Sequence, residues 1–116
     1  MARLLALKQR RPWDRGLGRA AVFELSEILR AYLGRRMQFD ALDLTTEELL
    51  AQMRERRPFA VDLADLSRDL AWHDLVKFAK AEPAALDCVH AIDKAASLVD
   101  RARGFLPTAA SQERAP

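Results

Sequence analysis

The chain has one cysteine, Cys88, among its 116 residues. A single cysteine excludes an intramolecular disulfide, and alone it cannot form a structural zinc site. This usage is typical of a reducing cytosolic compartment. The sequence also has only four glycines, five prolines and 7% aromatic residues, whereas Ala and Leu are abundant and favour helices over strands. The composition therefore predicts an all-α fold.

Long apolar runs are also missing. The run at residues 4–7 is far shorter than the roughly 20 residues of a membrane-spanning helix. Lys8, Arg10 and Arg11 follow it at once, without the small-residue cleavage site of a signal peptide. The length of the chain is typical of one small domain that buries a modest core without disulfides or metal.

The net charge of +2 hides an uneven distribution of charge. Residues 1–36 hold nine Lys/Arg against three Asp/Glu, whereas residues 37–116 hold ten against fourteen. A basic N-terminal segment can contact nucleic acid or anionic lipid, or it can be a solvated tail. Because Gly16 and Gly18 discourage a helix there, we expect residues 1–18 to form a basic leader or a juxtamembrane flank.

Apolar residues at helical spacing predict four helices, over about residues 20–37, 46–57, 62–79 and 82–103. They form a compact helical domain at residues 19–106, and residues 107–116 form a disordered tail. The apolar phase slips at residues 71–74, which predicts a kink or break beside Trp72. Leu75 and Phe78 are expected in the core, so that Phe78→Ala would cost about 3–5 kcal/mol.

The clearest local signal is the start of the second helix. Thr45 is placed to accept a hydrogen bond from the backbone N–H of Glu48, whose side chain reaches back to the N–H of Thr45. Leu44 and Leu49 occupy the flanking positions of a hydrophobic staple. This capping box accounts for the two threonines and two glutamates at residues 45–48, which otherwise suggest a carboxylate pair for acid/base chemistry.

Three segments together resemble the small C-terminal cytoplasmic domain of BatD-like proteins. The segments are FELSEILRAYL at 23–33, ALDLTTEELL at 41–50 and DLVKFAK at 74–80, and the resemblance spans about residues 20–103. Two features depart from the family pattern: an aromatic–glycine pair does not follow Arg35 and Arg36, and the sequence holds no preceding membrane helix. The chain is therefore either an excised piece of a longer protein or a soluble relative.

The resemblance implies a non-enzymatic interaction or adaptor domain in a system of MoxR-type AAA+ ATPases and von Willebrand factor A-domain proteins. It also implies a cytoplasmic position at the inner face of the bacterial inner membrane. The alternative is a small helical nucleic-acid-binding protein that uses the basic N-terminal segment with Arg35 and Arg36. Against this, the rest of the chain is net acidic, and no helix carries a cluster of base-reading side chains.

Residue chemistry gives no catalytic constellation, and we expect no cofactor, metal or small-molecule substrate. Cys88 and His90 lie about 200° apart around a helix, so they do not face one metal ion together with His73. Large aromatic and basic side chains often serve interfaces, and the candidates for binding a protein partner are Trp72, Lys77, Lys80, Arg35 and Arg36. The alternatives are core packing for Trp72 and a solvated rim around Phe78 for the lysines. The candidates for binding an anionic membrane surface are Lys8, Arg10, Arg11, Trp13 and Arg15.

Overall fold

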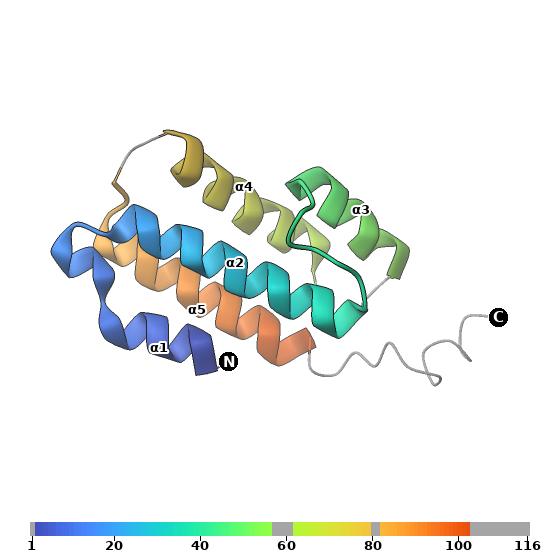
Figure 1. Cartoon of the computed structure of the whole chain (residues 1–116), viewed down its shortest axis with the longest axis horizontal. Coiled ribbons are helices and arrows are strands. Elements are labelled where there is room, and N and C mark those ends of the chain that lie inside the picture. The colour runs from blue at the N-terminus through green and yellow to red at the C-terminus, as the bar shows by residue number, and fades with distance from the viewer. Residues whose placement is uncertain (1, 57–61, 80–81, 103–116) are drawn as a thin grey trace.

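The computed structural model describes residues 2–56, 62–79 and 82–102 (Figure 1). Its helices are α1 (Ala2–Arg10), the 3-10 turn η1 (Pro12–Arg15), α2 (Gly18–Met37), α3 (Thr46–Arg56), α4 (Leu63–Ala79) and α5 (Ala85–Ala102). No strand occurs in these ranges, so the predicted all-α class is confirmed, with five α-helices instead of four. The predicted tail at 107–116 lies outside the described residues.

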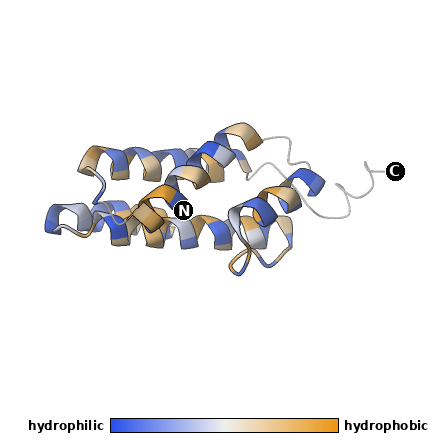
Figure 2. Ribbon diagram, turned by 90° about the horizontal axis from the view of Figure 1, so that it is seen from above, coloured by the Kyte–Doolittle hydropathy of each residue, from blue (hydrophilic) through white to orange (hydrophobic). Residues whose placement is uncertain are grey.

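Helix α2 occupies the centre of the fold. It packs against α5 and α4, while α1 lies against both α2 and α5, and α3 packs on α4 (Figure 1). Every described helix carries both hydrophobic and hydrophilic residues (Figure 2), because one face of each is turned to the core. The fully buried side chains include Leu25, Leu29 and Leu33 of α2, Leu66 and Leu70 of α4, and Leu98 of α5. None of the described helices is both long and apolar enough to cross a membrane.

The N-terminal segment is part of this fold, so its assignment as a separate leader is wrong. Leu4 and Leu7 share one face of α1 and are 1% and 0% exposed. Trp13 follows in η1 and is 7% exposed. Gly16 has a positive φ of 73° that ends η1, and it lets the chain turn into α2. The glycines thus close a turn between two packed helices.

The capping box at the start of α3 is confirmed. The backbone N–H of Glu48 donates to Thr45 Oγ1 over 3.1 Å, and the N–H of Thr45 donates to Glu48 Oε1 over 2.9 Å. These hydrogen bonds favour the ionised carboxylate and lower the pKa of Glu48. Leu49 is fully buried, and Leu44 is half-buried against the core, as expected for the two positions of a staple.

Replacing Thr45 with alanine should therefore lower the free energy of unfolding by about 1 kcal/mol. The substitution removes the acceptor for the Glu48 N–H at the first turn of α3. Urea unfolding followed by circular dichroism measures the change. Glu47→Gln, at an exposed neighbour, serves as the control, because it keeps both hydrogen bonds of the cap and removes only one exposed charge from the first turn, so it should lower the midpoint less than Thr45→Ala does. Equal midpoints for Thr45→Ala and Glu47→Gln would contradict the assigned cap.

Helix α4 is continuous, so the break expected beside Trp72 is wrong. His73 faces inward with only 2% exposure, and Asp74 and Lys77 are half-buried. These inward polar side chains interrupt the apolar pattern while the backbone stays helical. The core positions predicted for Leu75 and Phe78 are also wrong, because these side chains are 63% and 76% exposed.

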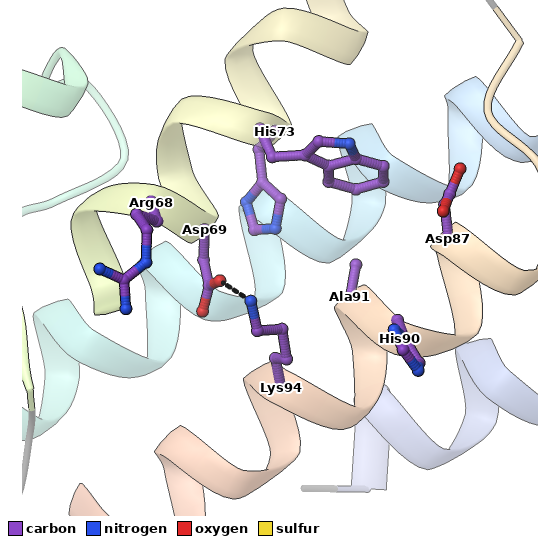
Figure 3. A pocket seen from close by; sticks show the side chains of 8 residues that line it. Arg68, Asp69, His73, Asp87, His90, Ala91 and Lys94 are labelled. Atoms are coloured by element: carbon purple, nitrogen blue, oxygen red, sulfur yellow. Dashed lines mark ion pairs between the residues drawn. The ribbon is translucent and has the colours of Figure 1, made fainter. Parts of the chain in front are cut away.

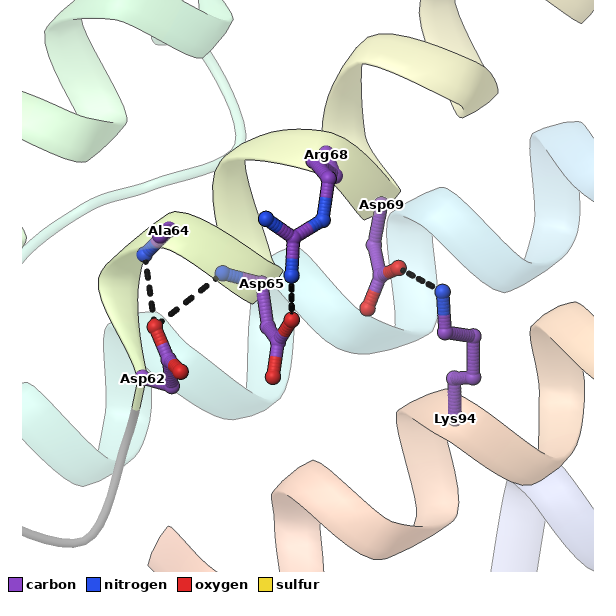
Figure 4. A network of polar contacts seen from close by, with 6 residues as sticks. All are labelled: Asp62, Ala64, Asp65, Arg68, Asp69 and Lys94. Carbon is purple, nitrogen blue, oxygen red and sulfur yellow. Dashed lines mark hydrogen bonds and ion pairs between the residues drawn. The ribbon is translucent and has the colours of Figure 1, made fainter.

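The start of α4 agrees with the sequence prediction, whereas the start of α5 does not. Asp62 caps α4, accepting hydrogen bonds from the N–H groups of Ala64 and Asp65 over 2.9 and 3.2 Å (Figure 4). By contrast, α5 begins at Ala85, three residues after the start predicted at residue 82. The side chain of Glu82 accepts a hydrogen bond from the N–H of Gly18 at the start of α2, so it serves another helix.

Candidate functional site

A surface pocket of about 520 Å³ lies between α2, α4 and the connection that leads into α3. We call it the α2–α4 pocket. Its lining comprises Phe23, Ser26, Glu27, Arg30, Leu42, Leu44, Thr45, Thr46, Asp74, Lys77 and Phe78. Three stretches that are distant in sequence therefore converge on one hollow.

The floor of the pocket is held by the guanidinium of Arg30, which is 7% exposed. Its Nη1 donates to the carbonyl oxygen of Leu44, and its Nη2 donates to Thr46 Oγ1, each over 2.8 Å. The hydroxyl of Thr46 in turn donates to Asp74 Oδ2 over 2.6 Å. One arginine thus ties α2 to the start of α3, and through Thr46 to α4.

A second set of hydrogen bonds ties α2 directly to α4. The ammonium of Lys77 donates to Ser26 Oγ over 2.8 Å, and Arg30 Nε donates to the same oxygen over 3.4 Å. Ser26 is 1% exposed, so its hydroxyl is available only to these neighbours. The two cations are therefore fixed side by side in the pocket.

Little negative charge lies near these two cations. Burial lowers the pKa of Arg30, and burial followed by the nearby Arg30 charge lowers the pKa of Lys77, while Asp74 opposes both changes. Within the described ranges, neither cation has a carboxylate oxygen within 4.0 Å. Arg30 and Lys77 thus share the field of one carboxylate, that of Asp74.

Three large apolar side chains are exposed at the rim of the pocket. Phe23, Leu42 and Phe78 are 43%, 53% and 76% exposed, and Leu75 extends the apolar surface one turn back along α4. Lys77 Nζ lies 5.7 Å from the centre of the Phe23 ring, within cation–π range. An apolar rim around a charged floor suits an amphipathic ligand, because it offers surface to bury and groups that fix orientation.

A smaller hollow of about 220 Å³ lies between α4 and α5 (Figure 3). Trp72 and His73 line it from α4, and an ion pair of 2.9 Å between Asp69 and Lys94 crosses it. His73 Nδ1 is buried without a hydrogen-bond partner among the described residues. Burial lowers the pKa of His73 to about 4, so the ring is neutral at pH 7. No group of three metal-ligating side chains occurs in the part of the chain that the structure describes.

The structure does not bring the predicted partner-binding residues together. Lys77 lines the α2–α4 pocket, whereas Trp72 lies half-buried at the α4–α5 hollow. Arg35 is exposed near the end of α2, and Arg36 Nε donates to the carbonyl oxygen of Ala102 over 3.3 Å. Lys80 lies outside the described residues. Sequence reasoning thus identified one residue of the pocket, Lys77.

Sequence reasoning missed the polar residues of the pocket floor, which are Ser26, Arg30, Thr46 and Asp74, and it assigned none of the exposed apolar residues Phe23, Leu42 and Phe78 to a binding site. A signal for the first two was present, because Ser26 and Arg30 are four apart on α2 and so lie on one helix face. They lie between the core positions of that helix, where a polar pair needs a partner in the fold. The positions of Thr46 and Asp74 depend on how three helices pack, which the sequence pattern did not reveal.

Among the residues predicted to bind a membrane surface, Trp13 is buried, so its predicted interfacial position is wrong. Most of the basic residues around it have acidic partners. Lys8 pairs with Asp93 at 2.7 Å, Arg11 pairs with Asp14 at 2.6 Å, and Arg10 pairs with Glu24. Arg15 is exposed at the end of η1. The positive charge of this segment is therefore largely balanced within the fold.

Comparison with known proteins adds no further lead to this geometry. Neither the models of protein families, nor the curated proteins, nor the solved structures contain a match to the chain.

Proposed function

We propose that the chain is a non-enzymatic interaction domain that binds a partner protein at the α2–α4 pocket. The observation that carries the proposal is the exposure of Phe23, Leu42 and Phe78 around a single hollow with an ordered polar floor. Exposed large apolar side chains are unremarkable singly, but a group of them around a pocket is typical of a binding surface. The hydrogen bonds of Arg30 and Lys77 hold the floor in shape before a partner arrives.

The sequence resemblance supports the same surface. Each of its three segments, 23–33, 41–50 and 74–80, supplies side chains to the pocket: Phe23, Ser26, Glu27 and Arg30 from the first, Leu42, Leu44, Thr45 and Thr46 from the second, and Asp74, Lys77 and Phe78 from the third. We therefore propose a partner of the kind the resemblance implies, a MoxR-type ATPase or a von Willebrand A-domain protein. The corresponding location is the cytoplasmic face of a bacterial inner membrane.

Isothermal titration of the full chain with a MoxR-type ATPase and with a von Willebrand A-domain protein from the same genome tests this proposal. We expect one of them to bind, and we expect Phe78→Ala to weaken binding about tenfold, as loss of a central aromatic contact does. Leu86→Ala is the matched control, because Leu86 is 69% exposed and does not line the pocket.

The outcomes of this titration separate the competing functions. Binding that Phe78→Ala and Leu86→Ala affect equally would contradict the pocket as the docking site. Failure of both proteins to bind, together with tight binding of duplex DNA in the same buffer, would favour a nucleic-acid-binding protein.

The stability of Phe78→Ala is a separate prediction. Because the side chain is 76% exposed, its removal should change the free energy of unfolding by no more than about 0.5 kcal/mol. A core phenylalanine would give a loss of about 3–5 kcal/mol. Thermal and urea unfolding distinguish these values readily, and a loss in the larger range would show that Phe78 is buried in solution.

A further inference from the structure

We infer that the segment bound in the α2–α4 pocket carries a carboxylate side chain next to a large apolar side chain. The carboxylate lies at Lys77, and the apolar side chain lies against Phe23 and Phe78. This inference rests on the proposed interaction function and specifies the chemistry of the partner.

The charge of the pocket floor carries the inference. Arg30 is buried and Lys77 is half-buried, and the hydrogen bonds described above connect both cations only to uncharged oxygens. Among the described residues, Asp74 is the carboxylate whose charge acts on both cations, and its Oδ2 already accepts a hydrogen bond from the hydroxyl of Thr46. A partly desolvated charge without a full counter-charge is unfavourable. A carboxylate that binds here therefore gains more binding free energy than one that binds at an exposed lysine.

Lys77 is the cation that such a carboxylate reaches. Arg30 lies at the floor with 7% exposure and its guanidinium committed to Leu44 and Thr46, whereas Lys77 is less buried and lies beside the exposed Phe23 ring. A group bound at Lys77 Nζ therefore also contacts the apolar rim, which places the apolar neighbour of the carboxylate over Phe23 and Phe78.

Two further charges lie beside this position. Arg19 lies with its Cζ 5.1 Å from the centre of the Phe23 ring, and it donates to the carbonyl oxygens of Val76 and Lys77. It adds positive charge at the mouth. Glu27 opposes it from the rim but is exposed, so water and salt screen its charge. The balance at the mouth therefore favours an acidic ligand over a basic one.

Selection of random dodecapeptides displayed on phage against the full chain provides the probe. We expect the enriched peptides to carry Asp or Glu within two residues of a large apolar side chain. A synthetic enriched peptide, its Glu→Gln or Asp→Asn counterpart, and the protein variants are then compared by fluorescence anisotropy.

The central measurement is a double-mutant cycle between the peptide carboxylate and Lys77. Lys77→Met should weaken binding of the acidic peptide about tenfold and binding of the neutral counterpart less than about twofold, because the substitution removes the charge pair itself. Glu27→Gln should slightly strengthen binding of the acidic peptide. Lys8→Met is the control, since Lys8 pairs with Asp93 away from the pocket and its loss should leave binding unchanged.

A second variant separates the charge of Lys77 from its structural hydrogen bond. Ser26→Ala removes the acceptor of Lys77 but keeps the ammonium, so the acidic peptide should still bind better than its neutral counterpart. Loss of this preference in Ser26→Ala, with the fold intact by circular dichroism, would show that the hydrogen bond and not the charge governs binding, and would overturn the inference.

The remaining outcomes separate the inference from the proposed function. If the enriched peptides bind Phe78→Ala more weakly but carry no acidic residue, the inference of a bound carboxylate is wrong, whereas the pocket is still the docking site. If the Phe78→Ala substitution weakens binding of none of the enriched peptides, both the carboxylate inference and the proposed docking site are wrong. Self-association of the chain in sedimentation that Phe78→Ala abolishes would assign the pocket to a second copy and overturn the inference.

Discussion

Replacing Leu7 with alanine should lower the free energy of unfolding by about 2–5 kcal/mol, the range for a leucine removed from a packed core. Leu7 is fully buried in α1, which contacts both α2 and α5. The total stability of a domain of this size is about 5–15 kcal/mol, so the loss is a large part of it. If residues 1–18 were a solvated leader, the same substitution would have almost no effect.

The control for this prediction lies in the same helix. Leu5 is 54% exposed, so Leu5→Ala should change stability by no more than about 0.5 kcal/mol. Urea unfolding of both variants under identical conditions measures the difference. Equal stabilities would mean that α1 does not pack on the rest of the protein in solution. A large difference would establish that the domain includes its N-terminal segment.

The parts of the fold that the sequence predicted well are those determined by neighbours in the chain. The start of α3 depends on hydrogen bonds between residues three apart, Thr45 and Glu48, so its signal is complete within one turn. The start predicted near residue 62 also agrees with α4, whose hydrogen bonds to Asp62 are equally local. Helix α1 is different, because a helix of nine residues is marginal in water and depends on tertiary contacts. Its stability comes from α2 and α5, which lie elsewhere in the sequence.

The same distinction explains the errors in α4. The alternation of apolar and charged residues around Lys77 predicts a core face containing Leu75 and Phe78. Periodicity shows that two faces differ, but it does not show which of them is covered. Here the covered face includes His73 and part of a polar network, while the apolar side chains of Leu75 and Phe78 are exposed. Exposed apolar faces of this kind are typical of protein interaction surfaces.

The pocket itself could be predicted only in part. The sequence predicts Lys77 as a candidate because its side chain is basic, but the residues that fix its ammonium come from separate parts of the fold. Ser26 lies 51 positions away, and Thr46 bonds to Asp74 across 28 positions. Such a network exists only once α2, α3 and α4 have packed, so no local pattern encodes it.

The buried imidazole of His73 should make the protein sensitive to acid. Burial lowers the pKa of His73 from 6.5 to about 4, the nearby Asp69 and Asp74 oppose this change, and Lys77 and Arg30 reinforce it. The unfolded chain therefore binds a proton at this side chain at a higher pH than the folded protein does. Stability should fall as the pH decreases from about 6.5 to about 4.

The expected size of this loss follows from the difference between the two pKa values. A difference of about 2.5 corresponds to roughly 3 kcal/mol by the time the pH reaches the folded-state value. His73→Leu keeps an apolar side chain of similar size in place but cannot titrate. The stability of the wild-type protein relative to this variant should decrease steadily through the window, whatever the two stabilities are at pH 7.

Urea unfolding at a series of pH values between 7 and about 4 measures this relative stability, over the window in which a histidine with a lowered pKa takes up its proton. The titration of Glu48, whose charge is not among those that act on His73, is common to both proteins and cancels in the difference. His90→Gln is the matched control for the loss of a histidine, because His90 is exposed on α5. If the wild type and His73→Leu lose stability in parallel, protonation of His73 is not what destabilises the fold in acid.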